Sequence, residues 1–95
     1  MRFDKDDLIF EMGQKSREIF LNIKGEIINM NTNRIFSVGA MIGKDDILFS
    51  RERVHTYKAT SEVYTLRIEK EVFEKMLKEF PEIKESILKV ANLNS

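Results

Sequence analysis

The feature that most constrains the fold of this chain is a series of short segments in which apolar and polar residues alternate. Glycines and polar turns separate these segments. The segments cover Phe3–Phe10 (two short strands around an acidic turn), Glu18–Lys24, Glu26–Met30, Ile35–Val38, Val54–Ala59 and Glu62–Ile68. Alternation with period two is typical of strands. In the segment Glu18–Lys24 it places Ile19, Leu21 and Ile23 on one face. In the segment Glu62–Ile68 it places Tyr64, Leu66 and Ile68 on one face. Many short strands with regular turns predict a sandwich or barrel, not alternating strand and helix units.

The periodicity becomes helical near residue 70. One apolar stripe at helical spacing is formed by Val72, Phe73, Met76, Leu77 and Phe80. Pro81 ends that helix and can open the next one, because proline is tolerated in a first helical turn but not in a helix interior. Helical spacing continues through Ile83, Ile87, Leu88 and Ala91. We therefore predict a mainly β fold in a single domain, 1–95. An antiparallel, jelly-roll-like β-roll spans about 1–69, and two short helices close it over about 70–92.

The segment from Gly43 to Ala59 is the best candidate for a binding site. It reads Gly-Lys-Asp-Asp-Ile-Leu-Phe-Ser-Arg-Glu-Arg-Val-His-Thr-Tyr-Lys-Ala. A glycine opens a one-turn, helix-like stretch, a charged loop containing Arg53 follows, and an alternating strand comes last. Glycine lets a backbone approach a ligand, backbone amides at a helix start point toward it, and arginine adds a planar positive charge. The segment thus has the outline of an anion site.

Further motifs occur in a fixed order along most of the chain. They are Leu8–Gly13, Ile19–Glu26 ending in Ile-Lys-Gly-Glu, Val38–Gly43 reading Val-Gly-Ala-Met-Ile-Gly, Arg53–Thr56 followed by Lys58–Ala59, and the helix–proline–helix ending Phe73–Ile87. In this register the chain resembles the cyclic nucleotide-binding domain family. The Gly43–Ala59 segment resembles that family's phosphate-binding cassette. The resemblance implies a β-roll that binds the cyclic phosphate and ribose of cAMP or cGMP, while a C-terminal helix moves to cover the base.

The resemblance also implies roles for individual residues. Arg53 would pair with the cyclic phosphate, and backbone amides near Asp46 and Val54 would donate to the same oxygens. Gly43 would lie against the ribose, and the family's glutamate, which accepts the proton of the ribose 2′-hydroxyl, falls on Lys44. The candidate ligand-binding residues are therefore Gly43, Lys44, Asp45, Asp46, Arg53 and Val54. No catalytic residue, metal ligand or further cofactor is predicted.

Three departures from the family's pattern make this cassette non-standard. Lys44 offers only donors, so the usual charged hydrogen bond to the 2′-hydroxyl cannot form unless neighbouring Asp45 supplies the acceptor. Asp45 and Asp46 stand where the family has apolar or small residues, and a carboxylate near a phosphate repels it. Glu52 replaces a common proline, which leaves the loop before Arg53 less constrained. Loss of one charge-assisted hydrogen bond costs about 1.5–3 kcal/mol, roughly ten- to hundredfold in affinity, so we expect binding to be weakened or lost.

Simpler interpretations of the same residues stay open. Arg53 could be an exposed member of the charged run Arg51–Arg53, and residues 44–46 could form a capped turn that faces solvent. His55 is expected to be a strand residue without chemistry, because no partner stands at metal-ligand or triad spacing. The three aspartates between residues 4 and 7 lack the glycine and terminal glutamate of a calcium loop, so we interpret them as turn charges.

Composition argues against several classes of function. Sixteen basic and sixteen acidic residues cancel, which leaves no overall field to attract nucleic acid or an anionic membrane. The chain has no cysteine and one histidine, which removes disulfides, thiolate zinc sites, cysteine nucleophiles and histidine-based metal clusters. No apolar run approaches the roughly 20 residues that a membrane-spanning helix needs. No nucleophile elbow or P-loop is present, so we predict that the chain is not an enzyme.

The sequence therefore predicts a regulatory module, cytoplasmic or at the cytoplasmic face of a membrane protein, that works with other domains of a longer chain. In the leading hypothesis, it binds cAMP, cGMP or a similar small anion in the Gly43–Val54 cassette. Binding would then move the helices that begin near Val72. In the alternative, it is a degenerate cyclic nucleotide-binding homology domain that serves interaction or assembly without responding to nucleotide. Neither hypothesis requires nucleic acid or membrane contact by this segment.

Overall fold

A computed structural model describes residues 1–83 and 85 of the chain. Its elements are β1 (Arg2–Phe3), β2 (Leu8–Phe10), β3 (Glu18–Lys24), β4 (Ile27–Asn29), β5 (Ile35–Phe36), β6 (Met41–Ile42), α1 (Lys44–Leu48), β7 (Tyr57–Ala59), β8 (Val63–Glu69) and α2 (Lys70–Glu79). Residues 81–83 and 85 also have helical backbone. The remainder of the second predicted helix lies outside the described residues. No helix in the described part has the length and apolar content needed to cross a membrane.

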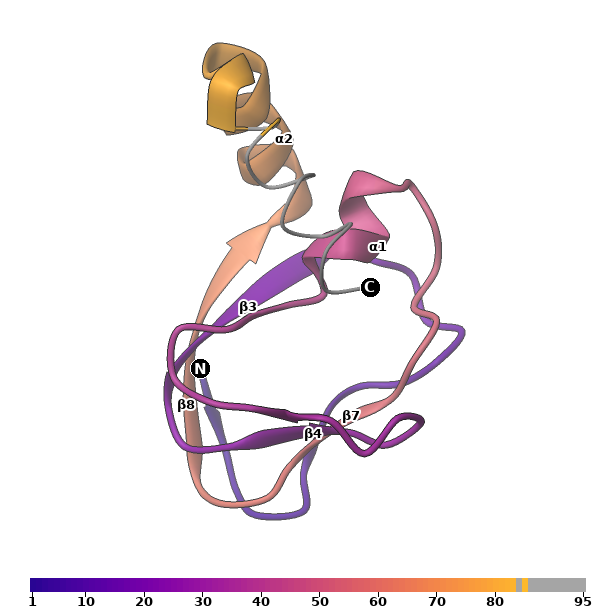
Figure 1. Cartoon of the computed structure of the whole chain (residues 1–95), viewed down its shortest axis with the longest axis vertical. Coiled ribbons are helices and arrows are strands. Elements are labelled where there is room, and N and C mark those ends of the chain that lie inside the picture. The colour runs from indigo at the N-terminus through magenta and orange to yellow at the C-terminus, as the bar shows by residue number, and fades with distance from the viewer. Residues whose placement is uncertain (84, 86–95) are drawn as a thin grey trace.

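The strands form two four-stranded antiparallel sheets that curve into a roll (Figure 1). One sheet has the strand order β1–β8–β3–β6, and the other has the order β2–β7–β4–β5. The longest ladder joins β3 to β8, from Glu18 opposite Glu69 to Lys24 opposite Tyr64. This architecture confirms the predicted mainly β fold, an antiparallel β-roll with helices at its C-terminal end.

The main core draws apolar side chains from both sheets. Its buried members are Phe3, Ile9, Phe10, Phe20, Ile27, Ile42, Ala59 and Val63. The rings of Phe3 and Phe20 meet edge to face, with centroids 5.9 Å apart. Such aromatic contacts add about 0.5–1.5 kcal/mol to the burial of the rings themselves. The core therefore ties the two sheets together around aromatic side chains.

The two long strands direct their apolar residues to different sides. In β3, Phe20 belongs to the main core, whereas Ile19 is buried on the opposite side, in a second cluster beneath the helices. Ile23, farther along this outer face, is 52% exposed. In β8, Val63 packs in the main core and Leu66 is 52% exposed. The face shared by Ile19, Leu21 and Ile23 is thus the outer face of the roll, because successive strand side chains alternate between faces.

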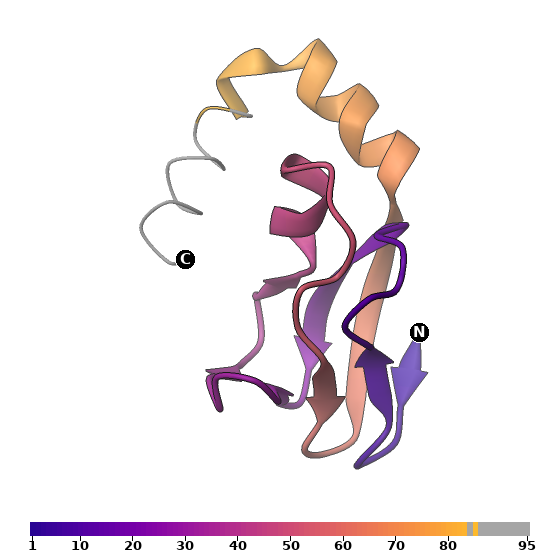
Figure 2. The same ribbon diagram turned by 90° about the vertical axis from the view of Figure 1, so that its right-hand side faces the viewer.

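The second cluster joins the helices to the roll. It consists of Ile19 from β3, Ile47 from α1, and Phe73 and Leu77 from α2. Figure 2 shows α2 continuing upward from β8 and arching over α1. Only part of the predicted helical stripe is buried, since Val72 is 58% exposed. The cluster places α2 in direct contact with the cassette helix.

Two predicted strands are shorter than expected. The strand predicted over 54–59 begins only at Tyr57, and the one predicted over 35–38 ends at Phe36. The chain before Tyr57 makes other hydrogen bonds: the Arg53 amide donates to the Gln14 carbonyl at 2.8 Å, and the Arg53 carbonyl accepts from the Gly13 amide at 2.8 Å. These bonds anchor the end of the cassette loop to the turn at residues 13–14 instead of to a strand.

Candidate ligand cavity and cassette

Gly43 opens the cassette in a conformation that suits glycine alone. Its φ is 91°, in the left-handed region, and α1 begins at the next residue. A Cβ on Gly43 would lie 2.4 Å from Nη1 of Arg53 and 3.1 Å from Cε2 of Phe10. Glycine is therefore required both by the backbone angle and by the close approach of the Arg53 guanidinium.

A cavity of about 660 Å³ opens beside the cassette. Its walls come from β4 and β5 with the turn between them, from β6 and α1, and from the loop that leads to β7: Asn29, Thr32, Arg34, Phe36, Gly39, Ala40, Met41, Ile42, Gly43, Lys44, Asp45, Asp46, Arg51, Val54, His55 and Tyr57. Its volume is typical of small-molecule sites. Of the six predicted site residues, all except Arg53 line this cavity.

Arg53 points into the protein. It is 2% exposed, Nη1 donates to the Gly43 carbonyl at 2.9 Å, and Nη2 donates to the Glu18 carbonyl. Its guanidinium carbon lies 3.9 Å from the ring centroid of Phe10, a cation–π contact. Burial lowers the pKa of Arg53 from its ordinary value, and the charge of Asp46 opposes that shift. The interpretation of Arg53 as an exposed member of a charged run is therefore wrong.

Asp46 is a buried carboxylate held between two arginines. It is 5% exposed; Nε of Arg51 donates to its Oδ1 at 2.9 Å, and Nη1 of Arg53 lies 3.5 Å from its Oδ2. A solvent-facing turn at residues 44–46 is therefore wrong for Asp46. A buried carboxylate needs such partners, because an unpaired buried charge costs several kcal/mol.

The next two cassette residues form the wall nearest the start of α1. Nζ of Lys44 lies 3.7 Å from Oδ1 of Asp45. That same Asp45 oxygen is buried and accepts no hydrogen bond. Asp45 thus lines the cavity with a carboxylate whose buried oxygen has unused acceptor capacity, next to the Lys44 ammonium.

Asn29 and His55 complete a polar wall that the sequence did not indicate. Oδ1 of Asn29 accepts from the amides of Asn31 at 2.9 Å and Thr32 at 3.2 Å, and its Nδ2 lies 3.0 Å from Nδ1 of His55. Because an amide NH₂ only donates, a neutral His55 accepts at Nδ1 and carries its proton on Nε2. His55 thus lies in the loop before β7, and its prediction as a strand residue was wrong. Tyr57 lines the same wall, and burial raises its pKa.

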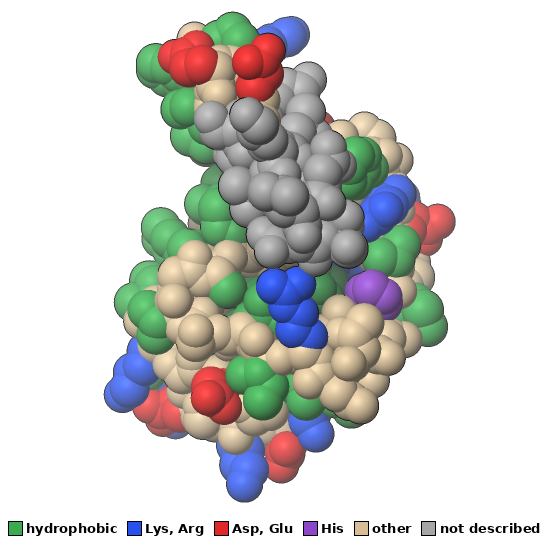
Figure 3. Space-filling view, viewed as in Figure 1, with side chains coloured by type: hydrophobic (Ala, Val, Ile, Leu, Met, Phe, Trp, Pro, Cys, Tyr) green, Lys and Arg blue, Asp and Glu red, His purple; other side chains and the backbone are tan. Residues whose placement is uncertain are grey.

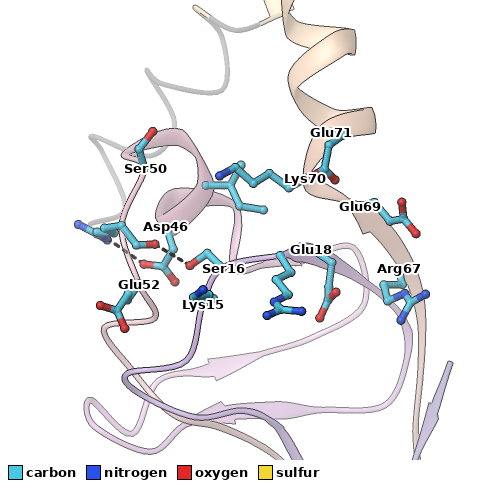
Figure 4. Close-up of a pocket in the computed structure, with 13 residues that line it drawn as sticks. Lys15, Ser16, Glu18, Asp46, Ser50, Glu52, Arg67, Glu69, Lys70 and Glu71 are labelled. Carbon is cyan, nitrogen blue, oxygen red and sulfur yellow. Dashed lines mark hydrogen bonds and ion pairs between the residues drawn. The ribbon is translucent and has the colours of Figure 1, made fainter.

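A second cavity, of about 600 Å³, lies at the junction of β3, α1, β8 and α2 (Figure 4). It is lined by Lys15, Ser16, Arg17, Glu18, Asp46, Ile47, Ser50, Arg51, Glu52, Arg67, Glu69, Lys70 and Glu71. Asp46 and Arg51 line this cavity as well as the first. The hydroxyl of Ser16 donates to the Arg51 carbonyl at 2.7 Å, which holds the cassette loop against the start of β3. Asp46 therefore stands in the partition between the two cavities.

The charges on the visible surface are mixed. On the face shown in Figure 3, Lys and Arg side chains alternate with Asp and Glu along the rim, and the residues drawn in colour form no patch of a single sign. Within the described residues, no group of three or more His, Cys, Asp or Glu side chains could hold a metal ion. Besides the two cavities beside the cassette, a groove lies between α1 and α2.

No family model matches the sequence, and no curated protein matches it. Solved structures do share its fold. The regulatory subunit of a cAMP-independent protein kinase A from Trypanosoma brucei aligns with a TM-score of 0.74 and 19% identity, over 90% of this chain and 34% of that one. The PKAR CBD2 domain with bound Sp-2Cl-cAMPS aligns with a TM-score of 0.80 and 17% identity, over 97% and 65%. An EAL enzyme in its cAMP-bound form aligns with a TM-score of 0.76 and 15% identity, over 96% and 27%.

These alignments define the class of fold: a cyclic nucleotide-binding β-roll. The chain with this sequence and structure has this fold over its described residues, as its motifs predicted. It spans about a third of the trypanosome subunit and about a quarter of the EAL enzyme.

Proposed function

We propose that this chain is a regulatory module that binds a cyclic nucleotide, or a related small anion, in the cavity beside the cassette. The proposal is carried by one observation: in a cyclic nucleotide-binding fold, Gly43, Lys44, Asp45, Asp46 and Val54 converge on a single cavity of about 660 Å³. The module takes no part in catalysis. It acts within a longer cytoplasmic protein and passes its signal to other domains.

In this proposal Asp45 accepts the ribose hydroxyl in place of the family's glutamate. Lys44 cannot take that role, because an ammonium group has only donors. Asp45 lines the cavity, and its Oδ1 has no hydrogen-bond donor in reach. A ligand hydroxyl would satisfy that oxygen, which favours a sugar over a ligand with no hydroxyl group.

The contact between α1 and α2 supports the coupling of binding to movement of α2. Ile47 of the cassette helix packs against Phe73 and Leu77 of α2 in the second cluster. A ligand that shifts α1 therefore changes the surface on which α2 rests. The ligand can shift that equilibrium only by its difference in affinity for the two positions of the helix.

Amide chemical shifts measured during titration with cAMP and cGMP test the proposal. Saturable shifts confined to residues 43–59 and α2 are expected, with dissociation constants above micromolar because the family's glutamate is missing. Asp45→Asn should weaken binding about tenfold, the loss typical of one hydrogen bond to a charged group. Asp4→Asn, which changes an exposed carboxylate outside the cavity, should leave binding unchanged. Absence of any response at millimolar concentrations of both nucleotides refutes the proposal.

A second candidate function is favoured by the position of Arg53. This arginine is buried against Asp46 and does not line the cavity, so the residue implied to hold the phosphate is engaged within the protein. The chain would then serve as an interaction or assembly module that does not respond to nucleotide. The fold does occur in the regulatory subunit of a kinase described as cAMP-independent. In the titration above, a folded protein that stays silent to both nucleotides supports this second function.

A further inference from the structure

Asp46 contacts both the ligand cavity and Arg53, which does not line that cavity. The Asp46 carboxylate lines that cavity, and its Oδ2 lies 3.5 Å from Nη1 of the buried Arg53. We propose that Asp46 is a built-in anion that occupies, at Arg53, the place of a ligand's phosphate, so that a phosphate must displace this carboxylate to reach the arginine. The inference rests on the proposed function, because it describes how a ligand gains access to the same site.

Arg53 keeps a donor for such an anion. Its Nη1 donates to the Gly43 carbonyl and its Nη2 to the Glu18 carbonyl, but its Nε is buried and has no acceptor. Buried donors are nearly always satisfied in folded proteins, so the unpaired Nε leaves the guanidinium with one donor to offer an incoming anion. An anion that replaces Asp46 would find a charged group already fixed by two carbonyls and the Phe10 ring.

The Asp46 carboxylate also has a place to go when it is displaced. Asp46 lines the second cavity, where Figure 4 shows it on the same side as Lys15 and Ser16. Arg51, which lines both cavities, can stay paired with the carboxylate as it turns. Lys70, at the first position of α2, lines the same cavity. Displacement of Asp46 by a ligand therefore brings a negative charge toward the start of α2.

The test removes the charge of Asp46 and keeps its shape. Asp46→Asn is titrated with cAMP, with adenosine as a ligand without phosphate, and with inorganic phosphate. The Nε–Hε resonance of Arg53 is followed in each titration. We expect cAMP to bind the variant at least tenfold more tightly than the wild-type chain, adenosine to bind both equally, and the Arg53 resonance to shift with cAMP and with phosphate in the variant. Asp7→Asn is the matched control, because Asp7 is exposed and lies outside both cavities.

The outcomes separate this inference from the proposed function. Equal cAMP affinity in wild type and Asp46→Asn overturns the inference and leaves the proposed function standing. An Arg53 resonance that neither cAMP nor phosphate moves in the variant also overturns it. If phosphate moves that resonance only in the variant while cAMP binds neither chain, the inference stands and the proposed nucleotide function fails. Asp46→Ser, a small residue of the kind the family carries here, gives the same comparison should the asparagine variant not fold.

Discussion

Replacement of Gly43 by alanine tests whether the Arg53 side chain sits where the structure places it. The left-handed backbone at Gly43, with φ of 91°, costs an alanine about 1–2 kcal/mol. The new Cβ would lie 2.4 Å from Nη1 of Arg53, so the guanidinium must move and lose its hydrogen bond to the Gly43 carbonyl. A hydrogen bond to a charged group is worth about 1.5–3 kcal/mol. We therefore expect Gly43→Ala to lower the free energy of unfolding by about 2.5–5 kcal/mol.

Gly39→Ala is the matched control. Gly39 has nearly the same backbone angle, with φ of 95°, but a Cβ there would meet nothing within 4 Å. Its substitution should therefore cost only the backbone strain, about 1–2 kcal/mol. The difference between the two variants isolates the displacement of Arg53, about 1.5–3 kcal/mol.

Urea unfolding followed by circular dichroism measures this difference. With a denaturant slope of about 1 kcal/mol per molar urea, the lower end of the range for small proteins, the two midpoints should lie about 1.5–3 M apart. Unequal denaturant slopes would show that one variant also changes the compactness of the native or the denatured state. Equal midpoint shifts for Gly43→Ala and Gly39→Ala would contradict the placement of Arg53 beneath Gly43.

Two further predictions concern the second cluster and the surface. Phe73→Ala should lower the free energy of unfolding, measured in urea, by about 3–5 kcal/mol, because Phe73 is fully buried. Val72→Ala, at an exposed position of the same helix, should change it by less than about 0.5 kcal/mol. Equal losses in the two variants would contradict the assignment of the buried face of α2. The Arg2 guanidinium, 2.7 Å from Glu62, lowers the pKa of Glu62. The contribution of this ion pair to folding stability is therefore complete above the ordinary pKa of a glutamate and is lost as the pH falls through the lowered pKa. In an NMR titration, Arg2→Ala should return the pKa of Glu62 toward its ordinary value, and an unchanged pKa would refute the pairing.

The strands could be predicted from the sequence, but which face of each strand points into the core could not. The bounds predicted for Glu18–Lys24 match β3, because alternating residues between turns leave few other possibilities. Alternation does not say which face is the inner one. Ile19 is buried beneath α1 and α2, which begin about 25 and 50 residues later, and Phe20 is buried in the roll. Both sides of the strand are covered near its start, so its pattern alone could not identify the inner face.

The candidate site was predicted as a segment, not as an arrangement. Motif spacing identified the cassette side of the cavity, because a glycine followed by one helical turn fixes the local backbone, but it did not identify the wall that contains Asn29 and His55. The inward turn of Arg53 depends on the Glu18 carbonyl and the Phe10 ring, which lie far from it in the sequence. Asp46 was expected to face solvent or a ligand, since carboxylates are seldom buried without a partner. Its two arginine partners become visible only once the loop is folded.

The direct passage of β8 into α2 gives the chain a mechanical property. Glu69 ends the strand and Lys70 begins the helix, with no residue between them, and the Lys70 amide donates to the Arg17 carbonyl at 2.8 Å. The first residue of the helix is therefore held at this bend to the chain that leads into β3. A helix of this length extends about 15 Å beyond the bend, so a rotation of about 10° there carries its far end about 2.6 Å. Small changes at the bend are thus amplified at the end of the helix, where the chain continues toward Pro81.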